Sequence, residues 1–133
     1  VIVGQVNDFT LNDIDMNCSR ATNAYGLVLR DATGHVIKSR FVNDKNKANS
    51  LGGATYIYGG SQVMFNDCDF EGHFGLHAIN WSVVVAENCR LSAPGACYCT
   101  TDPDPVSSKI VARNCAWSGN KIALQAGSSF EES

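Results

Sequence analysis

A six-residue motif recurs along the chain and restricts the folds that the chain can adopt. The segments FNDCDF (65–70), AENCRL (86–91) and ARNCAW (112–117) each run from an apolar residue through an acid or amide and a cysteine to a large apolar residue. A single copy, with two carboxylates flanking a thiol, would suggest a metal or acid–base site. Three copies at similar spacing are instead typical of a structural repeat, in which the same residue types fill the same place in successive turns of the chain.

Two further copies lie upstream with other residues in the cysteine position, in FTLNDIDM (9–16) and GHVIKSRF (34–41). Across the five copies, the cysteine position recurs every 21 to 29 residues, and the position two residues later is always large and apolar. The residues at the cysteine position are Ile14, Ser39, Cys68, Cys89 and Cys115, and those two residues later are Met16, Phe41, Phe70, Leu91 and Trp117.

Each copy predicts two short strands joined by a corner. Apolar residues alternate with other residues on both sides of a two-residue gap, and because a strand keeps a period of two, the gap must be a bend. The residue just before the cysteine position is an acid or amide in four of the five copies. Asp and Asn tolerate the left-handed backbone conformation that a tight corner needs. The predicted corner residues are Asp13, Lys38, Asp67, Asn88 and Asn114.

A further strand follows each copy, and its inward positions also alternate. Short strands repeated in this way, with length variation confined to the connections, predict an all-β fold, a right-handed single-stranded parallel β-helix of about five coils. The 133 residues suffice for a single domain, residues 1–133, with a real core. The chain lacks an initiator Met, so we expect a processed product or a segment of a longer chain. The expected inward pairs are Leu27/Leu29, Thr55/Ile57, Leu76/Ala78, Cys97/Cys99 and Ile122/Leu124.

The rungs VMFNDCDF, VVAENCRL and IVARNCAW resemble those of the right-handed β-helices of the pectate-lyase and polygalacturonase superfamily, which phage tailspikes share. The resemblance covers Phe9 to Leu124, and it is specific for the fold but not for a function, because the rung is a packing motif. His73 in EGHFG matches the Gly-His-Gly of polygalacturonases only in part, and their Asn-Thr-Asp, Asp-Asp and Arg-x-Lys partners are absent. The calcium-binding acids and paired arginines of pectate lyases cannot be placed either.

The six cysteines include no C-x2-C pair, so no metal site is predicted. In a β-helix, Cys68, Cys89 and Cys115 would form an interior column of free thiols spaced by about 4.8 Å, the distance between strands. Cys97 and Cys99 would fall in another inward column. The alternative is that the cysteines form disulfides, which would place the protein in an oxidising compartment.

Composition limits the partners of the chain. The net charge is −3 and there is no surplus of basic residues, which argues against nucleic acid or an anionic membrane as a partner. The longest apolar runs, such as VVVA, have the length of a strand, so no membrane insertion is predicted. No motif implies a cofactor, and none is predicted.

Outward acids are the candidate catalytic residues. Asp69 and Glu71 would lie on one side of a groove, and glycoside hydrolysis needs two carboxylates about 5 to 10 Å apart. Asp102 and Asp104, in TDPDP, form a second candidate pair. The structural alternative for Asp69 is an ion-pair ladder, because its outward column alternates in sign. That column reads Asp15, Arg40, Asp69, Arg90 and Ala116.

Other outward columns are apolar or aromatic where a strand facing solvent should be polar. Met64, Val85 and Val111 are aliphatic and suit a subunit interface. The aromatic residues suit either an interface or a platform on which sugar rings stack. The candidate binding residues are Tyr56, Tyr58, His77 and Tyr98.

Two functions follow from these patterns. The first is a structural or receptor-binding module of a phage or virion-like tail spike or fibre, a homotrimer that contacts a surface polysaccharide. The second is a carbohydrate-active enzyme, a glycoside hydrolase or polysaccharide lyase, that uses surface Asp and Glu residues. Free thiols in the core favour folding in a reducing cytoplasm, where virion parts are made. We therefore expect a virion protein, with a secreted protein as the alternative.

Overall fold

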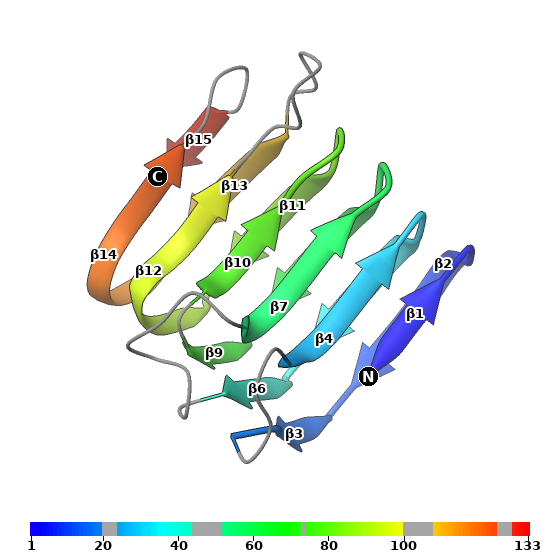
Figure 1. The fold of residues 1–133 in the computed structure, drawn as a ribbon, viewed down its shortest axis with the longest axis horizontal. Helices are drawn as coiled ribbons and strands as arrows, with labels where there is room; N and C mark the ends of the chain where they lie inside the picture. Colours follow the sequence, from blue (N-terminus) through cyan, green and yellow to red (C-terminus); the bar gives the residue numbers. More distant parts are fainter. Residues whose placement is uncertain (20–23, 44–51, 73, 100–107, 125–128) are drawn as a thin grey trace.

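The computed structural model describes residues 1–19, 24–43, 52–72, 74–99, 108–124 and 129–133 as a parallel β-solenoid (Figure 1). This part of the chain contains fifteen strands and no helix. The strands are β1 (Ile2–Gly4), β2 (Asn7–Asn12), β3 (Asp15–Asn17), β4 (Ala24–Arg30), β5 (Thr33–Ile37), β6 (Arg40–Asn43), β7 (Gly52–Tyr58), β8 (Gln62–Asn66), β9 (Asp69–Gly72), β10 (Phe74–Ala78), β11 (Val83–Glu87), β12 (Arg90–Cys99), β13 (Lys109–Arg113), β14 (Ala116–Leu124) and β15 (Ser129–Glu132).

Every strand pairs in parallel with its counterpart in the neighbouring coil. One sheet has the order β2-β5-β8-β11-β13-β15. The second sheet contains the remaining strands and bends, because β12 pairs both with β9 and with β10. The chain passes alternately through the two sheets and winds as a right-handed parallel β-helix, as predicted (Figure 1).

The coils are less uniform than the sequence suggested. Three successive passages, β2–β4, β5–β7 and β8–β10, contain three separate strands each. The next two passages contain two strands each, because β12 and β14 run without a break around the bend where earlier passages are interrupted. In the described residues the three-stranded coil therefore occurs about three times rather than five. The register of β12 against β14 shifts between Ser92 and Gly95, so an irregularity within one strand replaces the interruption.

The predicted register is confirmed in both sheets. In the six-stranded sheet Val63 lies between Gly34 and Val84, the matching positions of the neighbouring copies. In the bent sheet Phe70 lies between Phe41 and Leu91. Because side chains alternate along each strand, this register fixes which residues face the core and which face outward in every coil.

The predicted corner residues adopt the left-handed conformation. Asp67 has φ 56° and Asn88 has φ 55°, and even Lys38, the one predicted corner residue that is neither Asp nor Asn, has φ 49°. The backbone N–H of each corner donates to the next coil, for example from Asp67 to the Glu87 carbonyl at 3.1 Å. The complete set of φ values is Asp13 62°, Lys38 49°, Asp67 56°, Asn88 55° and Asn114 53°.

The interior columns are buried in the middle coils and only half-buried at the ends. Cys68 and Phe70 are at most 1% exposed, and the Phe70 ring contacts Phe65 edge-to-face with centroids 4.8 Å apart. The prediction that every member is buried is wrong for the end members, because β3 and β14 each pair with a described strand on one side only. The half-buried members are Ile14, Met16, Cys115 and Trp117.

The cysteines of the column are unpaired, as predicted, and their thiols lie against backbone carbonyls. Cys89 Sγ is 3.2 Å from the Glu87 carbonyl, and Cys68 Sγ is 3.3 Å from the Asn66 carbonyl. Ser39 makes the equivalent contact in its own coil, donating from Oγ to the Ile37 carbonyl at 2.9 Å. Serine and cysteine are therefore interchangeable in this position because each donates to the carbonyl two residues earlier. The side chains of Cys97 and Cys99 lie outside the described part.

A second column of small buried residues lines the opposite corner and was not predicted. Ser61 Oγ accepts a hydrogen bond from Ala32 N at 3.1 Å, and Ser108 Oγ accepts one from Ser82 N at 3.2 Å. The signal was present in the sequence, because a small residue stands two positions before the first inward residue of the six-stranded sheet in four of the five copies. The column is Ala32, Ser61, Ser82 and Ser108, each at most 2% exposed.

The Lys38 corner should be strained in a way that glycine relieves. Replacing Lys38 with Gly should raise the free energy of unfolding by about 0.5 to 1 kcal/mol, because about 1 to 2 kcal/mol of left-handed strain outweighs the entropy cost of glycine. Denaturant unfolding measures the difference. Lys38→Ala keeps a Cβ atom and should leave the stability unchanged, so a stabilisation by Ala equal to that by Gly would contradict this account.

Candidate functional site

The groove at the bend of the solenoid contains the first pair of candidate catalytic acids. Asp69 and Glu71 lie on one side of β9 because they are two residues apart, while Phe70 between them faces the core. The groove has a volume of about 330 Å³. Its lining residues are Arg40, Asp69, Phe70, Glu71, Arg90, Leu91, Ser92, Ala116, Trp117 and Ser118.

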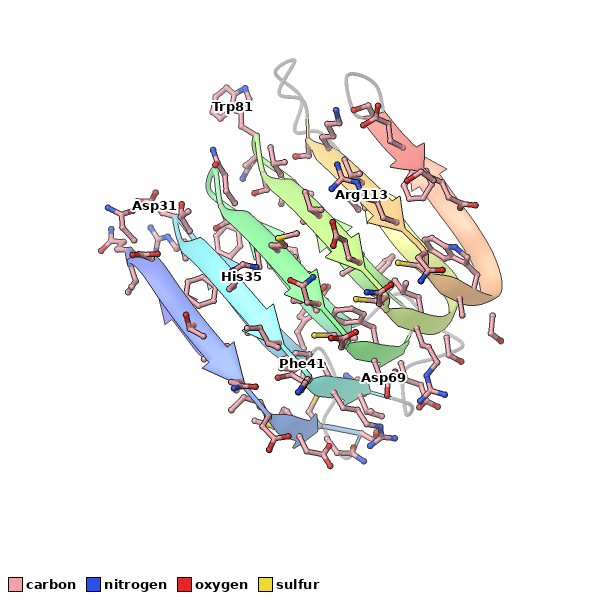
Figure 2. All side chains as sticks on the ribbon, turned by 180° about the vertical axis from the view of Figure 1, so that it is seen from behind. Asp31, His35, Phe41, Asp69, Trp81 and Arg113 are labelled. Carbon is pink, nitrogen blue, oxygen red and sulfur yellow. The ribbon has the colours of Figure 1, made fainter. Side chains whose placement is uncertain are left out.

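Both acids are engaged by arginines of the neighbouring coils. Arg90 donates two hydrogen bonds to Asp69, from Nε to Oδ1 at 2.8 Å and from Nη2 to Oδ2 at 3.0 Å. In the preceding coil, Arg40 Nη1 lies 3.6 Å from Asp15 Oδ1, and Arg40 Nη2 lies 3.6 Å from Glu71 Oε2. The Asp15–Arg40 and Asp69–Arg90 pairs of the predicted ladder are therefore present, and Arg40 also pairs with Glu71, which had been expected only in the groove. Figure 2 shows Asp69 at this bend, below the six-stranded sheet.

The electrostatics of the groove favour a charged Asp69. The hydrogen bonds from Arg90 lower the pKa of Asp69, and the charges on Arg90 and Arg40 lower it further against the opposing effect of burial. A carboxyl group that donates a proton to a glycosidic oxygen needs a raised pKa. Asp69 has the opposite environment, and the ion pair also occupies both of its oxygens.

A second cluster, here called the aromatic cluster, lies on the outer side of the bent sheet and comprises Tyr25, Tyr56, Tyr58, Phe74 and His77. The Tyr56 ring lies 4.9 Å from Tyr58 and 4.9 Å from His77, measured between centroids. Phe74 lies 4.7 Å from His77. Three of the four candidate binding residues therefore meet, but His77 is only 8% exposed because its neighbours pack over it. The side chain of the fourth, Tyr98, lies outside the described part.

Tyr25 was missed because the alternation of β4 changes at Gly26. A Cβ atom on Gly26 would lie 3.0 Å from Phe41 Cβ, so Gly26 faces the core. Leu27 is also buried, so two successive residues of β4 face inward and the strict alternation is broken there. Tyr25 is thereby placed on the outer side, 5.1 Å from Tyr56. Burial and the nearby Tyr56 raise the pKa of Tyr25 to about 12.

An apolar strip lies on the outward face of the six-stranded sheet and is formed by Met64, Val85 and Val111. The three residues are register neighbours on β8, β11 and β13. Met64 and Val85 are half-buried, and they line a shallow pocket of about 220 Å³ together with Gly34, Gln62, Val63 and Val83.

Polar residues border the apolar strip. Arg113 Nη1 lies 2.9 Å from Glu87 Oε1 in the next outward column, and Lys109 Nζ lies 3.0 Å from Glu131 Oε2 beyond Val111. Figure 2 shows Arg113 and His35 on this face. The strip therefore has an apolar centre and a charged border.

The remaining predicted residues are not brought into these clusters by the described structure. Asp102, Asp104 and His73 lie outside the described residues. Within the described ranges, no group of His, Cys, Asp and Glu side chains has a geometry that could hold a metal ion. The same ranges include no helix with the length and apolar character required to cross a bilayer.

Comparisons with known proteins returned no match from protein-family models, curated proteins or solved structures.

The ion pair between Asp69 and Arg90 should make the stability of the fold depend on pH, and the lowered pKa of Asp69 sets the direction of that dependence. A carboxyl group with a lowered folded pKa stabilises the fold above its unfolded value of about 3.9, and this contribution is lost as the pH falls through the folded value. Replacing Arg90 with Gln should raise the pKa of Asp69 and shift this loss to higher pH. An NMR titration of the Asp69 carboxyl carbon measures it, and an unchanged titration midpoint in the variant would show that the ion pair is absent in solution.

Proposed function

We propose that the chain is a non-catalytic β-helical module of a spike or fibre of a phage or virion-like particle. It works as a homotrimer, and its subunits meet along the apolar strip of the six-stranded sheet. Contact with a surface polysaccharide involves the exposed edges of the aromatic cluster. The resemblance of the rungs to those of tailspike β-helices supports the particle type.

The observation that carries this proposal is the apolar strip with its polar border. An apolar centre surrounded by charged side chains is the arrangement of protein interfaces. The next outward column of the same face contains the Arg113–Glu87 pair, so charged side chains border the strip on that side. Completing the burial of half-buried Met64 and Val85 would contribute about 1 kcal/mol for each side chain.

The state of the candidate acids supports a module without catalytic chemistry. Asp69 is held by two hydrogen bonds from Arg90, and Glu71 lies next to Arg40. The ladder therefore gives both carboxylates a structural role. For Asp69 this role follows from the stacking of successive coils, because the register places Arg40 and Arg90 on either side of it.

The assembly has a direct test in a pair of substitutions on the apolar strip. Met64→Asp combined with Val85→Asp should dissociate the homotrimer, so that its mass in solution falls to that of one chain. The reason is that two desolvated carboxylates would face the partner subunit. Light scattering measures the mass, and circular dichroism reports whether the β-structure is retained.

A matched control uses the same sheet. His35 and Thr10 are exposed residues of the same outward column, one coil and two coils away from Met64, respectively. Thr10→Asp with His35→Asp adds the same side chains on adjacent strands outside the strip and should leave the mass unchanged. A wild-type chain that is already monomeric, or an equal loss of mass in both double variants, would contradict the proposed interface.

The absence of catalysis is tested separately. Wild-type protein incubated with a panel of acidic and neutral polysaccharides should release neither reducing ends nor unsaturated products. Release of either product that disappears in Asp69→Asn or Glu71→Gln would establish the enzyme and overturn the proposed function, and the aromatic cluster would then be tested as its substrate cleft.

A further inference from the structure

The column of thiols has one end that solvent can reach. Cys68 is 0% exposed and Cys89 is 1% exposed, whereas Cys115, at the corner between β13 and β14, is half-buried. The three corners lie on successive coils, with the strands that follow them in register, and Cys115 and Cys68 are the two groups that most affect the pKa of Cys89. A reagent from solvent therefore meets the column at Cys115 first.

The surroundings of Cys115 favour its thiolate. The hydrogen bond with Cys89 lowers the pKa of Cys115 to about 6, against burial and the negative charge of Glu132, which raise it. The nearest basic side chain on its own passage, Arg113, is held by Glu87. The pKa of Cys89 is raised, mainly by its hydrogen bonds with Cys115 and Cys68, so Cys89 keeps its proton.

The backbone holds Cys89 and Cys115 in register. Ala116 N donates to the Cys89 carbonyl at 2.9 Å, and Arg90 pairs with Ala116 in the adjoining strands. Adjacent strands are about 4.8 Å apart, which falls within the range of about 4.4 to 6.8 Å between the Cα atoms of a disulfide. The spacing of the two backbones therefore meets the Cα requirement of a disulfide.

We propose that Cys115 is a peroxide-reactive thiol and that Cys89 is its resolving partner, so that oxidation links the last two corners of the column by a disulfide. The modification site lies outside the groove, the apolar strip and the aromatic cluster. It is independent of the proposed function.

The chemistry takes two balanced steps with hydrogen peroxide as the oxidant. The Cys115 thiolate attacks one peroxide oxygen, the O–O bond breaks, and the departing hydroxide takes up a proton to form water, leaving a sulfenic acid. Cys89 sulfur then attacks Cys115 sulfur, the S–O bond breaks, and the hydroxyl leaves with the Cys89 proton as a second water. Two thiols are oxidised by two electrons in total, and one peroxide is reduced to two waters.

Cys18 provides an internal comparison. It is also a half-buried thiol near the opposite end of the solenoid, with Sγ 3.4 Å from the Val42 carbonyl, but burial raises its pKa. Cys115 should therefore react at least about tenfold faster than Cys18 at neutral pH, because the thiolate is the reactive form.

The experiment treats the full native chain with a small excess of hydrogen peroxide, blocks remaining thiols with iodoacetamide, and maps the products by mass spectrometry after digestion without reductant. The expected result is a loss of two hydrogens from the intact mass and a cross-linked peptide pair containing Cys89 and Cys115. The link should raise the apparent melting temperature by about 5 °C, since it closes a loop in the unfolded chain. Reduction should reverse both changes.

Two variants make the result decisive. Cys115→Ser should prevent the link and still fold, because Ser39 occupies the same column position in an earlier coil, and Cys18→Ser should leave the link unchanged. Oxidation of Cys18 as fast as Cys115, a disulfide between any other pair, or conversion of Cys115 to a sulfinic acid without a link would overturn the proposal. Failure of the native chain to consume peroxide would overturn it as well.

Discussion

In-register parallel pairing between coils is the constraint on which the rest of this structure depends. Each strand donates and accepts hydrogen bonds with the strand before and after it, so a residue type placed in one coil meets its equivalent in the next. The left-handed corners maintain this register, since a corner of constant length restarts the alternation at the same position in every coil. Asp67 and Asn88, at φ 56° and 55°, show how closely the corners repeat.

The same constraint explains why the conspicuous acids of this chain have structural roles. Stacking places Asp69 beside Arg90 and Glu71 beside the rung that contains Arg40. The resulting ion pairs satisfy the carboxylates and hold the pKa of Asp69 low. A catalytic acid would need a position outside such a ladder, in an apolar setting that raises its pKa. The proposed function rests instead on the apolar strip, because a partner would cover its half-buried Met64 and Val85.

The column of thiols shows that residues which recur for packing can also be chemically reactive. Cysteine fits the corner because it is small and can donate to the carbonyl two residues earlier, as Ser39 does. Three cysteines in succession also bring their thiols within hydrogen-bonding reach of one another. The half-buried end member then differs from the two buried ones in access, although all three occupy the same structural position.

The fold, the register and the ion-pair ladder could be predicted from the sequence because they follow from periodicity. The inward position of Gly26 and the course of β12 could not be predicted in this way. Gly26 faces the core and reverses the alternation that would have hidden Tyr25, and no pattern of apolar residues signals that change. The continuous strand β12 likewise replaced two expected strands, since the break depends on a shift between Ser92 and Gly95. The column of small buried residues at the opposite corner could have been predicted from its constant spacing in the sequence, but the motif was defined around the cysteine and did not extend to it.

The central claim is that successive copies of the motif stack in parallel register. Nuclear Overhauser contacts in selectively labelled protein measure it most directly. The account predicts contacts between the Phe41 and Phe70 rings, whose centroids lie 6.1 Å apart, and contacts between the backbones of Asp69 and Arg90. A spectrum in which Phe70 contacts only residues near it in the sequence, or in which the strand contacts follow an antiparallel pattern, would contradict the account.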